Sequence, residues 1–235
     1  MPQEHTFKQF DTDLENVRSR VLQMGGLVEQ QISQAMESLL NADFELADTV
    51  VSNDHTVNAL EVAIDEDCAQ IIARRQPTAS DLRMIITAIK TITDLERIGD
   101  EAAKIARMTR EIHEAGRVMP NRFNQISFMN EVVLDMLHRA LDGFARLDVA
   151  DTVLIARKDR EVDEEYHLLL RNLITYMMED PRTIKNFIDL MFIAKSVERM
   201  GAHSRHISEY VVYMVKGKDI RHTTIDEIEQ HVSRS

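Results

Sequence analysis

The phrase Glu-Arg-x-Gly occurs twice in the chain, and each copy places a carboxylate at the end of an apolar helical stripe. The first copy holds Glu96 and Asp100, one helical turn apart, and the second holds Glu198. At about 100° per residue, Glu96 and Asp100 continue the line of positions that would pack the core. An ionised carboxylate on such a face is costly unless a cation compensates it. The phrase therefore predicts either a cation site or internal ion pairs.

A second acidic pair, Glu61 and Asp65, has the same spacing on the helix expected to face the first pair. Carboxylate oxygens suit Mg²⁺, Mn²⁺ or iron, whereas structural zinc sites use cysteine. We therefore predict a metal-binding face formed by four acids: Glu61, Asp65, Glu96 and Asp100. The alternative is a set of ion pairs with basic residues of the same helix: Arg97, Lys104 and Arg107.

The second copy departs from the first in its charges. Glu198 keeps its place, but Ala202 stands where Asp100 stood, and Arg205 joins the same line. The facing helix carries Tyr166 and an apolar residue in place of the two acids. We predict that Glu198 pairs with Arg205 or a neighbouring cation. Strong metal binding should then belong to the first copy.

Glycine follows Glu-Arg-x in both copies, at Gly99 and Gly201. Glycine inside a helix costs about 1 kcal/mol relative to alanine. Its recurrence indicates a close approach of neighbouring helices, or an opening for an ion beside the acids.

Long helices must position these groups. The 235 residues include 13 Met, no Trp, only 7 Gly and 4 Pro, which favours an all-α fold. Apolar residues spaced 3 and 4 apart predict a first helix of some 30 residues and a second one that ends before Pro77. A break of the second helix at Asn53–Asp54 remains open. The third helix is expected at about 78–114, the fourth at 126–147 and the sixth at 183–215. The fifth is expected to end at about residue 179.

The helical pattern repeats about a hundred residues later. Pro77 recurs as Pro181 and Glu96 as Glu198, so the offset changes only from 104 to 102. Such a constant offset indicates tandem duplication. We predict two tandem, pseudo-symmetric three-helix bundles, residues 1–116 and 117–235. The second should include a polar tail after residue 217 that is loosely held or only marginally helical.

Charge and composition exclude several classes of function. With 40 acidic and 28 basic residues, the net charge of −12 disfavours nucleic acid as a partner. The single cysteine, Cys68, is expected to be a buried apolar side chain in a reducing compartment. No basic start precedes an apolar run, and no membrane-length apolar segment occurs, so we expect a cytoplasmic protein without membrane insertion. Two histidines of the last long helix, His203 and His206, are expected at the surface or its boundary.

Six segments distributed along the chain are similar to those of one known family. They run in order from Gly25 to His222: "GGLVEQQISQAM", "EVAIDEDCAQIIARRQPTASDLR", "DLERIGDEAAKIAR", "RALDGFARLD", "TYMMEDPRTI" and "YVVYMVKGKDIRH". Their content and order resemble the PhoU family of phosphate-signalling regulators. The resemblance covers essentially the whole chain.

The resemblance implies a fold of two tandem three-helix bundles and a role that is not enzymatic. It implies a cytoplasmic negative regulator of the phosphate-starvation response and of phosphate uptake. Such proteins are thought to link the ATPase subunit PstB of the phosphate ABC transporter to the sensor histidine kinase PhoR. It also implies a homodimer or a larger assembly.

Some PhoU proteins bind metal clusters through Glu/Asp-x-x-x-Asp motifs, one in each bundle. Carried over residue by residue, Glu96 and Asp100 match this motif completely. Glu198 matches its first position only, so the second cluster is the weaker expectation. Glu61 and Asp65 come from helical spacing and not from the family motif.

Two other classes of function compete with a regulator. A carboxylate-bridged di-metal oxidase would need Glu-x-x-His on two helices and two further Glu. Here Glu164 and His167 fit strictly, and Asp135 with His138 fits loosely. The other alternative is a helical scaffold whose acids only provide solubility and whose metal is incidental.

Overall fold

Seven α-helices make up the part of the chain that the computed structural model describes, residues 3–114, 123–221 and 223–233. Their bounds are α1 Gln3–Asn41, α2 Phe44–Arg75, α3 Ala79–Glu114, α4 Asn124–Arg146, α5 Thr152–Glu179, α6 Ile184–Lys216 and α7 Ile225–Ser233. A short 3-10 helix, η2 (Pro181–Thr183), joins α5 to α6. The described residues contain no strand, so the predicted all-α fold is confirmed. None of these helices combines the length and apolar character that crossing a membrane requires.

The ends of α2 follow from local sequence chemistry. The Asp43 side chain accepts a hydrogen bond from the backbone N–H of Leu46 at 2.9 Å, which caps the first turn. The helix ends before Gln76, whose φ of 48° turns the chain ahead of Pro77. Between these ends α2 is continuous, so no break occurs at Asn53–Asp54.

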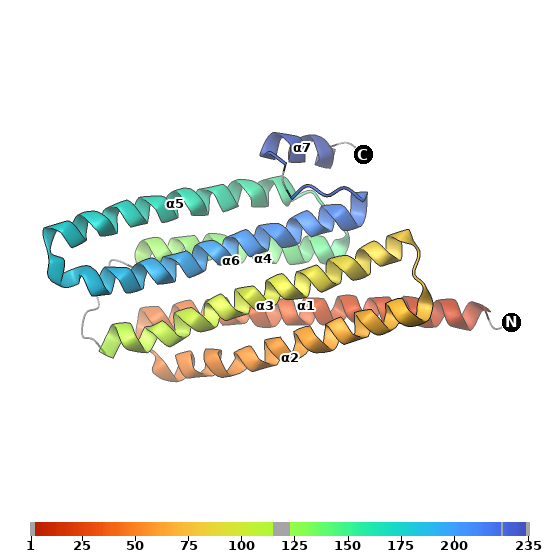
Figure 1. Ribbon diagram of the computed structural model, residues 1–235, viewed down its shortest axis with the longest axis horizontal. Coiled ribbons are helices and arrows are strands. Elements are labelled where there is room, and N and C mark those ends of the chain that lie inside the picture. Colours follow the sequence, from red (N-terminus) through yellow and green to blue (C-terminus); the bar gives the residue numbers. More distant parts are fainter. Residues whose placement is uncertain (1–2, 115–122, 222, 234–235) are drawn as a thin grey trace.

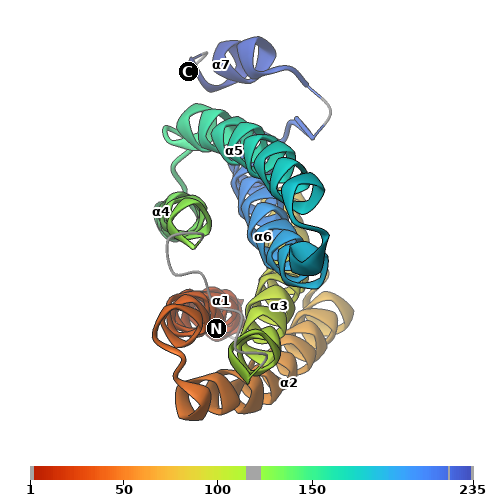
Figure 2. The ribbon, with the colours of Figure 1, turned by 90° about the vertical axis from the view of Figure 1, so that its left-hand side faces the viewer.

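The helices form two bundles of three, α1–α3 and α4–α6, which lie side by side along their length (Figures 1 and 2). The main contact between the bundles is made by their third helices, α3 and α6, and α1 also contacts α4. The third helices run antiparallel. Thr87 Oγ1 donates to the Tyr210 carbonyl at 3.3 Å, and Arg83 Nε donates to the Met214 carbonyl at 3.4 Å.

The predicted joint between the two bundles lies in residues 116–120, outside the described residues. The division into residues 1–116 and 117–235 therefore stays a prediction. The grouping of α1–α3 and α4–α6 into two bundles does not depend on this joint, because within each group every helix contacts the other two (Figure 2).

A single apolar core runs through both bundles. One connected cluster of buried side chains includes Met24 and Ile98 of the first bundle and Phe144 of the second. Cys68 belongs to it and is fully buried, as predicted. Burying one such side chain contributes about 1.5–3 kcal/mol, so the cluster stabilises the packing of the six long helices.

The C-terminal segment is better ordered than the predicted loose polar tail. It contains α7, which packs against α5. Ile228 is 3% exposed and Ile220 is 1% exposed, so both apolar side chains are docked. Arg157 Nη2 also lies 3.4 Å from Glu229 Oε2 at the surface. A few well-placed isoleucines are enough to anchor a segment that is polar on average.

Candidate metal-binding face and the contact between α3 and α6

The predicted ligands of the first bundle lie on one acidic face, formed by α2 and α3. Glu61 and Glu96 are half-buried, whereas Asp65 and Asp100 are exposed. The expectation that Glu96 and Asp100 both face the core is therefore wrong for Asp100. Four residues advance a helix by about 40° beyond one full turn. This rotation carries Asp100 out of the contact between α2 and α3.

Like charges act on one another across the acidic face. Burial raises the pKa of Glu96, and the charges of Asp100 and Glu61 raise it further. Burial also raises the pKa of Glu61, and Asp65 adds to that shift. Arg97 opposes both shifts without cancelling them. Among the described side chains no cation lies within 4.0 Å of Glu96 or Asp100, so the alternative of close ion pairs is not found for these two acids.

Asp54 is a further member of this face that was not predicted from the sequence. It is 5% exposed, and its Oδ1 atom has no hydrogen-bond partner within the described part of the chain. Gln31 lies beside it without completing a hydrogen bond of good geometry. Burial raises the pKa of Asp54 and Asp100 raises it further, while Arg107, 4.0 Å from Oδ2, lowers it. Its position two turns before Glu61 was the available signal.

The two glycines of the repeated phrase allow close approach beside aspartates, of which Asp54 is buried and Asp159 is half-buried. A Cβ at Gly99 would lie 3.0 Å from the nearest side-chain atom and 3.6 Å from Asp54 Oδ1. A Cβ at Gly201 would lie 3.2 Å from Val133 Cγ2 and 3.8 Å from Asp159 Oδ1. Packing therefore accounts for the recurrence of glycine at both positions, and each lies next to an acid of the second helix in its bundle.

The acidic face offers a donor set that fits a hard divalent cation. Its donors are carboxylate oxygens, their mutual repulsion would be relieved by positive charge, and Asp54 Oδ1 is an unpaired buried acceptor. No three of its ligating oxygens lie within 4.8 Å of one another among the described residues. Mg²⁺ keeps several of its waters, and such an ion could reach spread carboxylates through them. The arrangement can therefore attract and hold a hydrated ion.

Replacing Asp54 with asparagine should stabilise the metal-free protein at neutral pH. The change keeps the side-chain volume and removes a buried charge that Asp100 repels. We expect the free energy of unfolding, measured by urea denaturation in a chelator, to rise by about 1 kcal/mol. Added Mg²⁺ or Mn²⁺ should stabilise this variant less than the wild type, because one oxygen ligand is lost. A variant less stable than wild type in chelator would contradict this role of Asp54.

The second bundle neutralises its own glutamate. Glu198 Oε2 lies 2.5 Å from Lys195 Nζ, and Lys195 also lies over the ring of Tyr166 at 5.1 Å from its centre. The predicted pairing of Glu198 with a nearby cation is therefore confirmed. The partner is Lys195 and not Arg205, because the guanidinium of Arg205 turns towards Asp159 of α5.

Arg205 compensates two acids of the second bundle, the buried Glu209 and the half-buried Asp159. Its Nη1 lies 3.0 Å from Asp159 Oδ2, and its Nε lies 3.2 Å from Glu209 Oε1. Burial raises the pKa of both carboxyl groups, and Arg205 partly opposes these shifts. The cation of the second bundle thus lies closer to its acids, at 3.0 and 3.2 Å, than Arg107 lies to Asp54 on the acidic face of the first bundle, at 4.0 Å.

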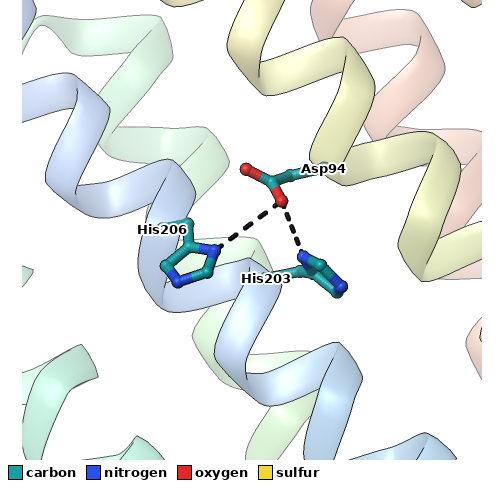
Figure 3. Close-up of side chains that lie close together, drawn as sticks. All are labelled: Asp94, His203 and His206. Carbon is teal, nitrogen blue, oxygen red and sulfur yellow. Dashed lines mark hydrogen bonds and ion pairs between the residues drawn. The ribbon is translucent and has the colours of Figure 1, made fainter. Parts of the chain in front are cut away.

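Two polar pairs, each with a buried acid of α3, connect α3 with α6 between the bundles. Glu101 Oε1 lies 2.7 Å from Arg199 Nη1, and Asp94 Oδ1 lies 2.6 Å from His203 Nδ1 (Figure 3). The expectation of a surface or boundary position is wrong for His203, which is 8% exposed, because this side of α6 packs against α3. His206 is half-buried, as expected for a boundary position.

The two candidate motifs of a di-metal oxidase do not face a bundle interior. The side chains of Glu164 and His167 on α5 are 66% and 61% exposed. The side chain of His138 is 73% exposed and its ring lies 3.0 Å from Glu29. Because these residues point to solvent, they cannot form the inward-facing ligand set of such an enzyme, and this alternative is wrong.

The fold and the acidic face together define a duplicated helical-bundle protein. Each bundle has three long helices, and the third helix of each carries the same Glu-Arg-x-Gly phrase (Figure 1). Comparison with known families shows to which family this protein belongs. The PhoU domain family model matches residues 21–109 and 126–211, one match in each bundle. The chain belongs to the PhoU family, whose members are accessory regulatory proteins and not enzymes.

Relatives match over nearly the whole chain. The phosphate-specific transport system accessory protein PhoU of Escherichia coli (strain K12) is 45% identical over 226 residues, 96% of this chain and 93% of that protein. The PhoU homolog of Pseudomonas aeruginosa is 44% identical over 231 residues, 98% of this chain and 95% of that protein.

Solved structures of the family have the same fold. The crystal structure of PhoU from Pseudomonas aeruginosa matches with a TM-score of 0.86 at 46% identity, covering 89% of this chain and 100% of that chain. The phosphate transport system regulatory protein PhoU from Streptococcus pneumoniae matches with a TM-score of 0.80 at 30% identity, covering 89% and 98%. The predicted tandem architecture is therefore confirmed.

Proposed function

We propose that this protein is a negative regulator of the phosphate-starvation response and of phosphate uptake. It acts in the cytoplasm by contacting the ATPase subunit PstB of the phosphate ABC transporter and the sensor histidine kinase PhoR. Signalling and uptake are thereby restrained when phosphate is plentiful. The observation that carries the proposal is the 45% identity, over 96% of this chain, to a protein named for its accessory role in phosphate-specific transport.

The surface of the molecule supports a role in protein contacts. Its net charge of −12 favours basic partner surfaces over nucleic acid. Large apolar side chains are also exposed near the turn between α5 and α6, including Met178 at 80% and Phe192 at 53%. Exposed apolar groups of this kind are typical of contact surfaces. These exposed apolar side chains support the proposal that the protein functions as a homodimer.

We further propose that Mg²⁺, Mn²⁺ or iron binds to the acidic face. The ligands are carboxylates of the first bundle: Asp54, Glu61, Asp65, Glu96 and Asp100. The unpaired Oδ1 of Asp54 and the like-charge repulsion at Glu96 support this assignment. The ion would supply positive charge that holds α2 against α3. Glu198, already paired with Lys195, would bind a metal only weakly.

Deleting the gene should derepress alkaline phosphatase in phosphate-rich medium to the level of phosphate-starved cells. The reason is that the kinase would signal without its restraint. The wild-type chain supplied on a plasmid should restore repression, and a tagged copy should retain PstB and PhoR from membranes of the same cells. The ATPase subunit of an unrelated transporter is the control for retention. Repression that persists after deletion would refute the regulatory role.

A further inference from the structure

Asp94, His203 and His206 form a compact group between the two bundles (Figure 3). Asp94 comes from α3, and the two histidines come from α6, three residues apart and therefore on one side of that helix. Both imidazole rings turn towards the same carboxylate oxygen. The Nδ1 atoms of His203 and His206 lie 2.6 Å and 3.7 Å from Asp94 Oδ1. The three ligating atoms all lie within 4.8 Å of one another.

This group is separate from the acidic face. Asp94 precedes Glu96 by two residues, which places the two carboxylates about 200° apart around α3. Asp94 consequently faces α6 of the second bundle, whereas Glu96 lies towards α2 of the first. A ligand bound at one position does not share a coordination sphere with a ligand at the other.

The surroundings of Asp94 favour its carboxylate as an anionic ligand of a metal ion. It is 4% exposed, and His203 is 8% exposed. Both of its close partners are imidazole nitrogens of α6, at 2.6 Å and 3.7 Å. A carboxylate this deeply buried strongly favours positive charge beside it.

Ion pairing with Asp94 gives a close contact to only one of the two histidines. His203 makes a close hydrogen bond to Asp94, whereas His206 at 3.7 Å is beyond hydrogen-bond distance. Two protonated imidazoles with ring centres 5.8 Å apart would repel each other. One divalent ion can instead bind both neutral rings and the carboxylate together. Two histidines and one carboxylate are a donor set of Zn²⁺ and of non-haem Fe²⁺, whereas Mg²⁺ prefers oxygen alone.

We propose that Asp94, His203 and His206 bind a divalent transition-metal ion of the Zn²⁺ class, and that this ion fastens α3 of the first bundle to α6 of the second. Water completes the coordination, as in other three-ligand zinc sites. The half-exposed His206 gives the ion a route from solvent. Because the ligands come from both bundles, metal binding stabilises their mutual contact. This site does not depend on the proposed regulatory function.

Zinc titration of the chelator-treated full-length protein, with Mg²⁺ in excess to occupy the acidic face, tests the proposal. The wild type should bind one Zn²⁺ per chain, and its melting temperature should rise by about 5–10 °C at a Zn²⁺ concentration a hundred times Kd. His206→Ala should weaken binding by about 100-fold or more, since even partners of a ligand contribute about 10- to 100-fold. Co²⁺ bound in place of Zn²⁺ should give visible absorption that the variant lacks.

Three further variants distinguish this site from zinc bound at surface histidines or at the acidic face. Asp94→Asn preserves the side-chain shape and should lose Zn²⁺ binding, with circular dichroism confirming the fold. His167→Ala removes an exposed histidine of α5 and should bind as the wild type does, as should Glu96→Gln with Asp100→Asn. The proposal is overturned if the wild type binds no stoichiometric Zn²⁺, or if His206→Ala and Asp94→Asn bind it as tightly as wild type. Loss of binding only in the Glu96 and Asp100 variant would also overturn it.

Discussion

Replacing Arg205 with alanine is expected to lower the free energy of unfolding by about 3 kcal/mol, because a buried and a half-buried carboxylate would lose their cation. Arg205 Nη1 lies 3.0 Å from Asp159, and its Nε lies 3.2 Å from Glu209. Glu209 is 3% exposed, so water cannot readily take the place of the guanidinium. Urea denaturation followed by circular dichroism at neutral pH would measure the loss.

The loss should become smaller as the pH falls. Burial raises the pKa of Asp159 and Glu209 even with Arg205 present, and removing that cation should raise both further. A carboxyl group with a raised pKa in the folded state costs stability above that pKa. The cost disappears as the pH falls through the folded-state pKa towards the unfolded-state value. The variant should therefore approach the wild type under mildly acidic conditions.

Two matched changes identify the cause of this effect. Arg205→Lys keeps a positive charge and should lose less stability than Arg205→Ala. Arg160→Ala removes an exposed arginine that pairs with Glu164 on the same helix, and such a pair contributes only about 0.3–0.5 kcal/mol. If Arg205→Ala were no more destabilising than Arg160→Ala at neutral pH, Arg205 would not be the internal cation of the second bundle.

The fold could be predicted from the sequence because its signals are local and repeated. Apolar spacing and proline positions set the helix bounds, and the offset between Pro77 and Pro181 revealed the duplication. The contact between the bundles could not be predicted in the same way. On α3, buried residues lie on more than one side: Ile92 and Ile98 are about 120° apart around the helix, and both are buried. A helical wheel does not distinguish the side that meets α2 from the side that meets α6.

The candidate sites show the same division between local and distant information. The spacing of apolar and acidic residues within each helix predicted that Glu61 and Glu96 lie on facing helices. In the structure the charge of Glu61 acts on Glu96. The burial of Asp94 and His203 was missed, because the partners are 109 residues apart and on different bundles. Asp54 was missed for a different reason: its spacing from Glu61 was available, but an isolated acid carries little signal in a chain with 40 acidic residues.

Neutralising the first copy of the repeated phrase, by Glu96→Gln with Asp100→Asn, is expected to abolish strong metal binding at the acidic face. Two oxygen ligands are lost, so the affinity for Mn²⁺ should fall by at least about 100-fold. In a chelator the variant should be slightly more stable than the wild type, because the repulsion between Glu96, Asp100 and Glu61 is removed. Titration calorimetry and urea denaturation measure the two effects. If the metal supports regulation, phosphatase should also be expressed in phosphate-rich medium.

Glu198→Gln is the matched control, because it makes the same chemical change at the corresponding position of the second bundle. Its glutamate already has a cation in Lys195, 2.5 Å away, and an ion bound there would have to compete with that lysine. The control should therefore retain Mn²⁺ binding and repression. If it abolished binding while the double variant retained it, the metal would belong to the second bundle. If neither change altered binding, stability or repression, the acids would contribute only solubility. The repeated phrase would then have kept its glutamate for reasons unrelated to a bound ion.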